Sequence, residues 1–313
     1  MLESLFILIV AIAVLSKASD WVVDSSVGLA RFLRISEFTI GFLLIAVITS
    51  LPEMMVSVFA AMSGSGNLAV ANVIGSNIAN IALVLGMGAI FGTLYFKRGA
   101  IGENAEVLLI ITIIPLLLLN SETIGLRGGL ILVGTFALYS LYLYRNSSTK
   151  KLVHVEVKDG TNLAKSILFF LIGISLVLIS AQFVVSSAVD LAKVIGISET
   201  VIGLTVVAFG TSIPELATTI TAVRKGKSSL AVGNIIGSCV ANLTLVLGIS
   251  ALLGVLTITL KAFSTSITFL VGITIFLWYI LFKDKGITTL QGLFMITVYL
   301  LFIAVEAGLV VFI

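Results

Sequence analysis

Two glutamates lie in apolar surroundings and share one local sequence. Glu53 follows Ile-Thr-Ser-Leu-Pro, and Glu215 follows Gly-Thr-Ser-Ile-Pro. A carboxylate near the middle of a bilayer costs roughly 2.5–3.5 kcal/mol on insertion scales, so such residues normally face a polar cavity and mark an ion or proton path. Because this costly residue occurs twice in the same motif, the pair predicts a cation or proton site.

The residues before each glutamate add further oxygen atoms. Thr49 and Ser50 lie four and three positions before Glu53, which places both hydroxyls on the carboxylate's face of a helix. Pro52 has no N–H and must kink or open that helix, which frees nearby carbonyl oxygens. Hard cations such as Ca²⁺ take six to eight oxygen ligands. The motif contains no His or Cys, which argues against zinc or copper.

A second polar stripe follows each motif. Asn72, Ser76 and Asn80 are spaced by four, so they lie along one side of a helix. Glycines and alanines between them allow neighbouring helices to approach closely. The alternative for Asn72 and Asn80 is that they only hold helices together through hydrogen bonds.

The composition indicates the elements that position these residues. Of 313 residues, 59% are hydrophobic and 11% are charged, and the mean hydropathy is +1.25. This content predicts an all-α polytopic membrane protein rather than a soluble domain. We expect ten segments to cross the bilayer, each long enough for roughly 30 Å of hydrocarbon. They are 4–32, 38–62, 68–92, 104–119, 124–144, 163–193, 199–223, 229–254, 262–282 and 289–312.

Basic residues predict the orientation. Fourteen of the eighteen Lys and Arg residues fall on one side of these segments, and the positive-inside rule makes that side cytoplasmic. The polar connection 146–162, with the solvated His154, then lies in the cytoplasm, and both termini lie outside the cell. The net charge of +3 reflects this topology and does not indicate nucleic acid. Cys239 is the single cysteine and cannot form an intrachain disulfide.

The chain contains an internal repeat. An offset of 162 residues aligns 35–86 with 197–248 without a gap, and 25 of the 52 positions are identical. Each half has five predicted spans, so the second copy enters the bilayer from the opposite side. Two inverted-topology five-helix repeats, 1–145 and 163–313, are typical of secondary transporters whose site lies at the midplane.

The paired Thr-Ser-Leu/Ile-Pro-Glu motifs, each followed by Asn-Val/Ile-Ile-Gly-Ser and a further Asn, resemble the two alpha repeats of the Ca²⁺/cation antiporter superfamily. This superfamily contains sodium/calcium and proton/calcium exchangers, and the resemblance, to the prokaryotic type, covers nearly the whole chain. It implies Ca²⁺ held by the two glutamates and two threonine carbonyls, monovalent-cation sites formed with four serines, and a first and sixth span that slide against the other helices. The residues implied in the site are Glu53, Glu215, Thr49, Thr211, Asn80, Asn242, Ser50, Ser212, Ser76 and Ser238.

One departure from that family bears on the coupling ion. Many sodium/calcium members carry an aspartate at a position corresponding to Asn80 or Asn242, whereas both are amides here. The site then has two carboxylates, Glu53 and Glu215, which can neutralise one Ca²⁺ or hold two protons. Ca²⁺ and protons would therefore exclude each other from the site, and for this reason we prefer protons as the coupling ion. The complete set of hydroxyls suits Na⁺, however, and the glutamate motif is of the sodium-exchanger kind, so Na⁺ remains the alternative.

Three functions could use a pair of buried glutamates in a membrane protein. The preferred one is antiport that exports Ca²⁺ from the cytoplasm in exchange for H⁺ or Na⁺. A passive cation channel with an acidic selectivity ring is the alternative of another class, but inverted repeats and proline-broken helices favour a transporter. An intramembrane enzyme would need a nucleophile or base that the motifs lack. We expect a monomer or weak homo-oligomer in the cell membrane, with no cofactor.

The first segment carries acidic residues of its own. Asp20 lies three positions after Lys17 and could pair with it. Asp20 and Asp24 are either solvated or paired near the cytoplasm, or they line an access path. The corresponding positions in the second half are Gln182 and Ser186, so the two copies differ here.

Overall fold

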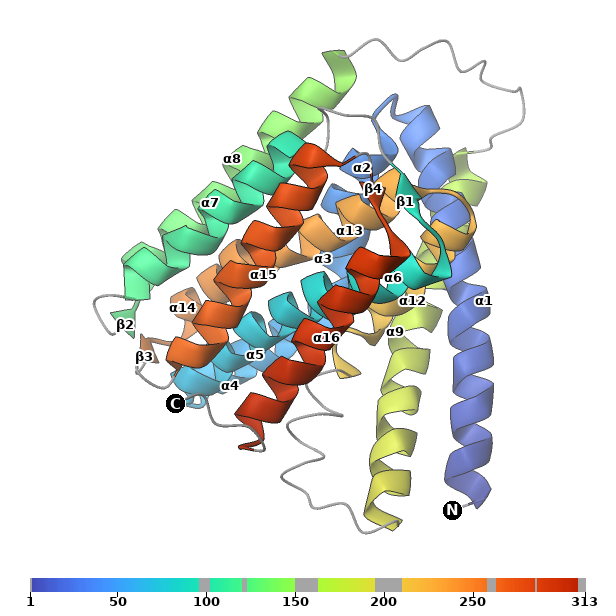
Figure 1. The fold of residues 1–313 in the computed structure, drawn as a ribbon. Helices are drawn as coiled ribbons and strands as arrows, with labels where there is room; N and C mark the ends of the chain where they lie inside the picture. Colours follow the sequence, from blue (N-terminus) through green and yellow to red (C-terminus); the bar gives the residue numbers. More distant parts are fainter. Residues whose placement is uncertain are drawn as a thin grey trace.

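The computed structural model describes residues 2–95, 102–119, 123–149, 163–194, 210–257, 263–284 and 286–308. Apart from four two-residue strands, its regular elements are helices (Figure 1). The first half contains α1 (Leu2–Phe32), α2 (Glu37–Ile40), the π-helical η1 (Gly41–Ile45), α3 (Ala46–Thr49), α4 (Leu51–Met62), α5 (Gly66–Ile78), the π-helical η2 (Ala79–Val84), α6 (Leu85–Phe91), α7 (Gly102–Leu119) and α8 (Leu126–Thr149).

The second half contains α9 (Leu163–Val194), α12 (Ile213–Arg224), α13 (Ser228–Ala241), the π-helical η4 (Asn242–Val246), α14 (Leu247–Leu253), α15 (Ser264–Lys283) and α16 (Thr289–Glu306). The strands join distant parts of the chain in two antiparallel pairs. These pairs are β1 (Leu94–Tyr95) with β4 (Gly286–Ile287), and β2 (Thr123–Ile124) with β3 (Leu256–Thr257).

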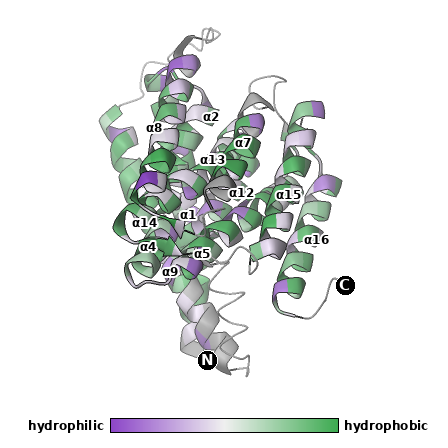
Figure 2. Ribbon diagram, turned by 90° about the vertical axis from the view of Figure 1, so that its left-hand side faces the viewer, coloured by the Kyte–Doolittle hydropathy of each residue, from purple (hydrophilic) through white to green (hydrophobic). Residues whose placement is uncertain are grey.

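The prediction of a polytopic membrane protein is confirmed. Among the described residues, seven helices are long and apolar enough to cross a membrane, or eight if the bent pair Glu37–Thr49 and Leu51–Met62 counts as one span. Large apolar side chains are exposed along α15 and α16, as expected for faces that contact lipid (Figure 2). The first part of the predicted span 199–223, up to residue 209, and most of the connection 146–162, including His154, lie outside the described ranges.

The predicted proline break is present before the first glutamate. The helix is interrupted at Ser50, and the axes on its two sides differ by 47°. Pro52 lies in the first turn of α4, where the missing N–H leaves no hydrogen bond unmade. Pro214 occupies the same place in the first turn of α12. Each glutamate therefore stands in the first turn of a new helix.

Two central helices run beside these broken ones. α5, η2 and α6 form one continuous span, and α13, η4 and α14 form the other; most of both spans is buried. Each widens into a π-helical stretch in mid-span, and these stretches contain Asn80 and Asn242. Single-turn π-helical irregularities often occur at functional sites. Figure 1 shows α13 in the middle of the bundle.

α1 and α9 lie side by side and extend beyond the rest of the bundle (Figure 1). Trp21 packs edge-on against Phe169, with ring centroids 5.6 Å apart. A Cβ on Gly173 would come within 3.2 Å of the Ala18 carbonyl, so the absence of a side chain there lets the two helices approach closely. This pair contacts the bundle mainly through α12 and α2.

Candidate functional site

The two glutamates from the repeated motifs are brought together inside the protein. Glu53 on α4 and Glu215 on α12 are both fully buried, and their carboxylates lie close enough to repel each other. The Ser212 hydroxyl donates to Glu53 Oε1 at 3.4 Å, and the Ser50 hydroxyl donates to Glu215 Oε1 at 3.4 Å. Each carboxylate therefore accepts from the serine that precedes the other glutamate, an arrangement that we call the crossed pair.

This crossing corrects the expectation that Ser50 shares a helical face with Glu53. The expectation assumed an unbroken helix, whereas the chain bends at Ser50 and turns its hydroxyl toward the opposite half. Thr49 also reaches the opposite half, because its hydroxyl lies 3.5 Å from Asn234 Oδ1. The Thr49 hydroxyl also donates to the carbonyl oxygen of Ile45 at 3.1 Å.

Ser238 adds a further donor on one side only. Its hydroxyl donates to Glu215 Oε1 at 3.4 Å and lies 3.4 Å from the Ala46 carbonyl oxygen. Its counterpart Ser76 is buried, and its hydroxyl has no hydrogen-bond partner in the structure. The two halves thus differ in how they hold the same serine.

Several oxygen atoms of the site are buried without a partner. Among the described residues, these unpartnered oxygens are Glu53 Oε2, Glu215 Oε2, Ser76 Oγ, Asn80 Oδ1 and Asn242 Oδ1. A buried acceptor without a partner costs about 1–3 kcal/mol, and more when it is charged, so native proteins rarely leave such groups unsatisfied. Carboxylate, amide and hydroxyl oxygens are the ligands that hard cations prefer. Within the described ranges, no three His, Cys, Asp or Glu side chains form a cluster, so a cation here would rely on two carboxylates and neutral oxygens.

Proteins of one known family resemble the chain over most of its length. The chain matches the sodium/calcium exchanger protein family over residues 3–145 and 165–307. It belongs to this family. The exchanger is thus a multi-pass membrane transporter and not an enzyme.

Individual relatives cover most of the chain. It is 33% identical over 260 residues to CaxA of Alkalimonas amylolytica, described as a candidate antiporter, covering 81% of this chain and 82% of that protein. It is 27% identical to the sodium/calcium exchanger MaX1 of Methanosarcina acetivorans, over 96% and 97% of the two chains. A solved structure of the sodium-calcium exchanger NCX_Mj, soaked with Na⁺ and Ca²⁺, superposes with a TM-score of 0.85 at 28% identity, covering 98% of this chain and 99% of that one.

Asn72 and its counterpart hold helices together in the exchanger. Asn72 Nδ2 donates to the Glu53 carbonyl oxygen at 3.1 Å and to Ser57 Oγ at 2.9 Å. Asn234 Nδ2 donates to Thr219 Oγ1 at 3.2 Å, and Asn234 and Thr219 are the positions that correspond to Asn72 and Ser57. The interpretation of Asn72 as an interhelical hydrogen-bond donor is confirmed, and its contact with the Glu53 backbone also supports the site.

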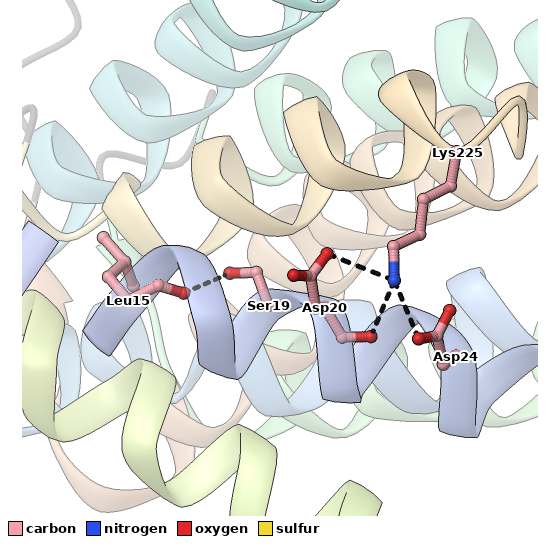
Figure 3. A network of polar contacts seen from close by, with 5 residues as sticks. All are labelled: Leu15, Ser19, Asp20, Asp24 and Lys225. Atoms are coloured by element: carbon pink, nitrogen blue, oxygen red, sulfur yellow. Dashed lines mark hydrogen bonds and ion pairs between the residues drawn. The ribbon is translucent and has the colours of Figure 1, made fainter. Parts of the chain in front are cut away.

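The acidic residues of α1 pair with the core of the exchanger. Lys225, just after α12, lies 3.1 Å from Asp20 Oδ1 and 2.8 Å from Asp24 Oδ2 (Figure 3). Partial burial alone would lower the pKa of Lys225, but Asp24 and Asp20 outweigh it, so the pKa lies above its usual value. The three-residue spacing predicts Lys17 as the partner of Asp20, whereas the structure pairs Asp20 with Lys225 across a helix interface.

One residue beside the site was missed by the motif analysis. Asn77, fully buried on α5, accepts a hydrogen bond from Asn242 Nδ2 at 3.3 Å. The only signal in the sequence was a difference between the repeats, because position 239, which corresponds to 77, is a cysteine.

Proposed function

We propose that this exchanger carries Ca²⁺ on the crossed pair of Glu53 and Glu215 and exports it from the cytoplasm in exchange for protons. The observation that carries the proposal is the crossed pair itself: two buried carboxylates, each with one oxygen bound to a serine of the other half and one oxygen unpartnered. Two carboxylates neutralise one divalent cation. The names of the relatives MaX1 and NCX_Mj, both sodium/calcium exchangers, support Ca²⁺ as cargo.

The remaining ligands are assigned around this pair. We propose that the Thr49 and Thr211 carbonyls complete the Ca²⁺ site and that the Asn80 and Asn242 amides lie next to it. Ser50, Ser76, Ser212 and Ser238 would serve neighbouring monovalent-cation sites. The burial of the amides and of the four serines supports this assignment, because buried oxygens need a partner.

Protons are the proposed coupling ion because they compete with Ca²⁺ for the same atoms. The site has amides at both Asn80 and Asn242, so Glu53 and Glu215 are its two carboxylates. One Ca²⁺ or two protons satisfy them equally in charge, and binding of one cargo excludes the other. Sodium is the second candidate. It is favoured by the hydroxyls of Ser50, Ser212 and Ser238, which already lie at the carboxylates.

We further propose that the chain forms ten transmembrane helices in two inverted five-helix repeats, 1–145 and 163–313, with 146–162 as a cytoplasmic linker and both termini outside the cell. The duplicated contacts support two equivalent halves. Asn72 with Ser57 and Asn234 with Thr219 are the same interaction at corresponding positions.

Transport into proteoliposomes containing the purified exchanger tests the proposal. Ca²⁺ uptake is measured first under an imposed pH gradient without Na⁺, and then under a Na⁺ gradient at fixed pH. Uptake driven by the pH gradient alone supports proton coupling, and uptake driven only by Na⁺ selects the second candidate. Ca²⁺ flux down its own gradient with no counter-ion would instead indicate a channel and overturn antiport.

A further inference from the structure

Asn77 lies beside the proposed site without belonging to the repeated motifs. It is the last residue but one of α5, is fully buried, and its Oδ1 accepts a hydrogen bond from Asn242 Nδ2 at 3.3 Å. Asn242 begins the π-helical η4 on the other half of the protein. The contact therefore joins the two halves at one of the site's two amides.

This contact fixes the orientation of an amide whose other atom is free. An Asn side chain is planar, with two N–H donors on one side and an oxygen acceptor on the other. Because Asn77 Oδ1 accepts from the Nδ2 atom of Asn242, the Oδ1 atom of Asn242 points the other way; the Nδ2 atom of Asn77 is itself buried without a partner among the described residues. The Oδ1 atom of Asn242 is buried and has no hydrogen-bond partner in the structure, so it is an oriented acceptor available to a cation.

The Asn80 amide, in the other half, has no equivalent of the hydrogen bond between Asn77 and Asn242 in the part of the chain that the structure describes. The position that corresponds to Asn77 is Cys239, and a thiol is only a weak acceptor. In the described structure, both polar atoms of the Asn80 side chain are buried without a partner. Two other contacts of the site are repeated in both halves: the serine-to-glutamate bonds and the Asn72 and Asn234 bonds. The halves also differ at Ser238 and Ser76, but the difference at positions 77 and 239 is the one that affects the amides.

We infer that Asn77 is a positioning residue of the cation site: it holds the Asn242 amide so that its oxygen serves the cation, while the Asn80 amide is left unheld. The inference rests on the proposed function, because it assigns Asn242 to that site. It also makes the two halves unequal, since only one amide is ordered before the ion binds. Pre-ordering a ligand strengthens binding by removing the entropic cost of ordering it.

A double-mutant cycle tests this inference. In Asn77→Ala, we expect the KM for Ca²⁺ in proteoliposomes to rise about 3- to 10-fold, the effect of losing one such hydrogen bond, with the maximal rate nearly unchanged. In an Asn242→Ala background, the same substitution should change KM by less than about 2-fold, because the amide that it positions is gone. An unchanged KM in Asn77→Ala, or equal increases in both backgrounds, would overturn the inference.

The chain offers a matched control at the corresponding position. Cys239→Ala should leave KM unchanged, because the hydrogen bond of Sγ goes to the backbone oxygen of Asn77, at 4.0 Å. A rise equal to that of Asn77→Ala would show general packing damage and count against positioning. Gel filtration and thermal unfolding in detergent check that each variant is folded. If Asn77→Ala does not fold, Asn77→Leu, which fills the volume without an acceptor, replaces it.

Ca²⁺ exchange by the wild-type protein and by Glu53→Gln shows whether a failure belongs to this inference or to the proposed function. If the wild type exchanges Ca²⁺ and Glu53→Gln does not, the site stands, and the cycle alone decides the role of Asn77. If the wild type exchanges no Ca²⁺, the proposed function itself fails.

Discussion

Replacing Glu53 by glutamine removes one of the two charges that we propose bind Ca²⁺ while keeping the shape of the side chain. Glutamine retains an oxygen that can accept from Ser212, so the crossed contact survives. The change therefore isolates the charge from the geometry. Glu215→Gln is the matched substitution in the other half, where Ser50 and Ser238 remain as donors.

The expected loss of affinity is large because the residue is fully buried. Two unit charges about 4 Å apart interact by roughly 4 kcal/mol at an effective dielectric constant of 20, so a divalent ion gains about 8 kcal/mol from each carboxylate. Glutamine also avoids the cost of burying a charge, which is several kcal/mol, so about 3–4 kcal/mol is lost. This corresponds to a dissociation constant for Ca²⁺ roughly 100- to 1000-fold weaker.

Isothermal titration of Ca²⁺ into the detergent-solubilised protein measures the affinity, and uptake into proteoliposomes measures transport. Glu306→Gln serves as the control, because Glu306 is exposed at the end of α16 and accepts from Ser266 away from the crossed pair. We expect both readouts to be unchanged in that control. If Glu53→Gln bound Ca²⁺ within about 10-fold of the wild type, a difference of only about 1.4 kcal/mol, the electrostatic reasoning would be refuted.

The remaining predictions concern the amides, the packing and the α1 contact. Asn242→Ala should weaken Ca²⁺ uptake more than Asn80→Ala, and gel filtration should show both variants folded; an unfolded product would indicate a packing role instead. Gly237→Ala should lower the melting temperature, because the added Cβ would lie 2.7 Å from Phe42 Cα and such overpacking costs about 1–3 kcal/mol. Gly75→Ala is the control at the corresponding position and should leave the melting temperature unchanged, because the space around Gly75 is open. Lys225→Gln should lower the free energy of unfolding by about 1 kcal/mol below about pH 10.5, where the lysine is charged. The difference from wild type should disappear as the pH rises through the raised pKa of Lys225. Thermal melts at a series of pH values measure both.

The sequence was informative wherever the chemistry is local. The two Pro-Glu motifs lie within single turns of helix, so the break in the chain and the burial of both glutamates followed from residue types alone. Composition predicted a polytopic membrane protein, and the structure and the family match confirm it. The number of ten spans and their inverted arrangement stay predictions.

The spacing of residues along a helix could not predict contacts between segments far apart in the sequence. Ser50 and Glu53 are three residues apart, which predicts a shared face, yet the serine binds a carboxylate 165 residues away because the helix bends at that serine. The partner of Asp20 is 205 residues away, just after the end of α12, a contact that the spacing with Lys17 could not reveal. Asn77 was missed for the same reason, since its role appears only when α5 and η4 are placed side by side.

The crossed pair also explains why an exchanger built this way would couple two ions. Burying two carboxylates without a counter-charge is far more costly than burying them neutralised, because each loses its hydration and repels the other. The unpartnered Oε2 atoms of Glu53 and Glu215 are where that cost arises. If the crossed pair carries the ions as proposed, a site loaded with Ca²⁺ or with protons would be enclosed by the protein more readily than an empty one. The return step after Ca²⁺ release would then require another cation on the same oxygens, and that requirement would separate exchange from leakage.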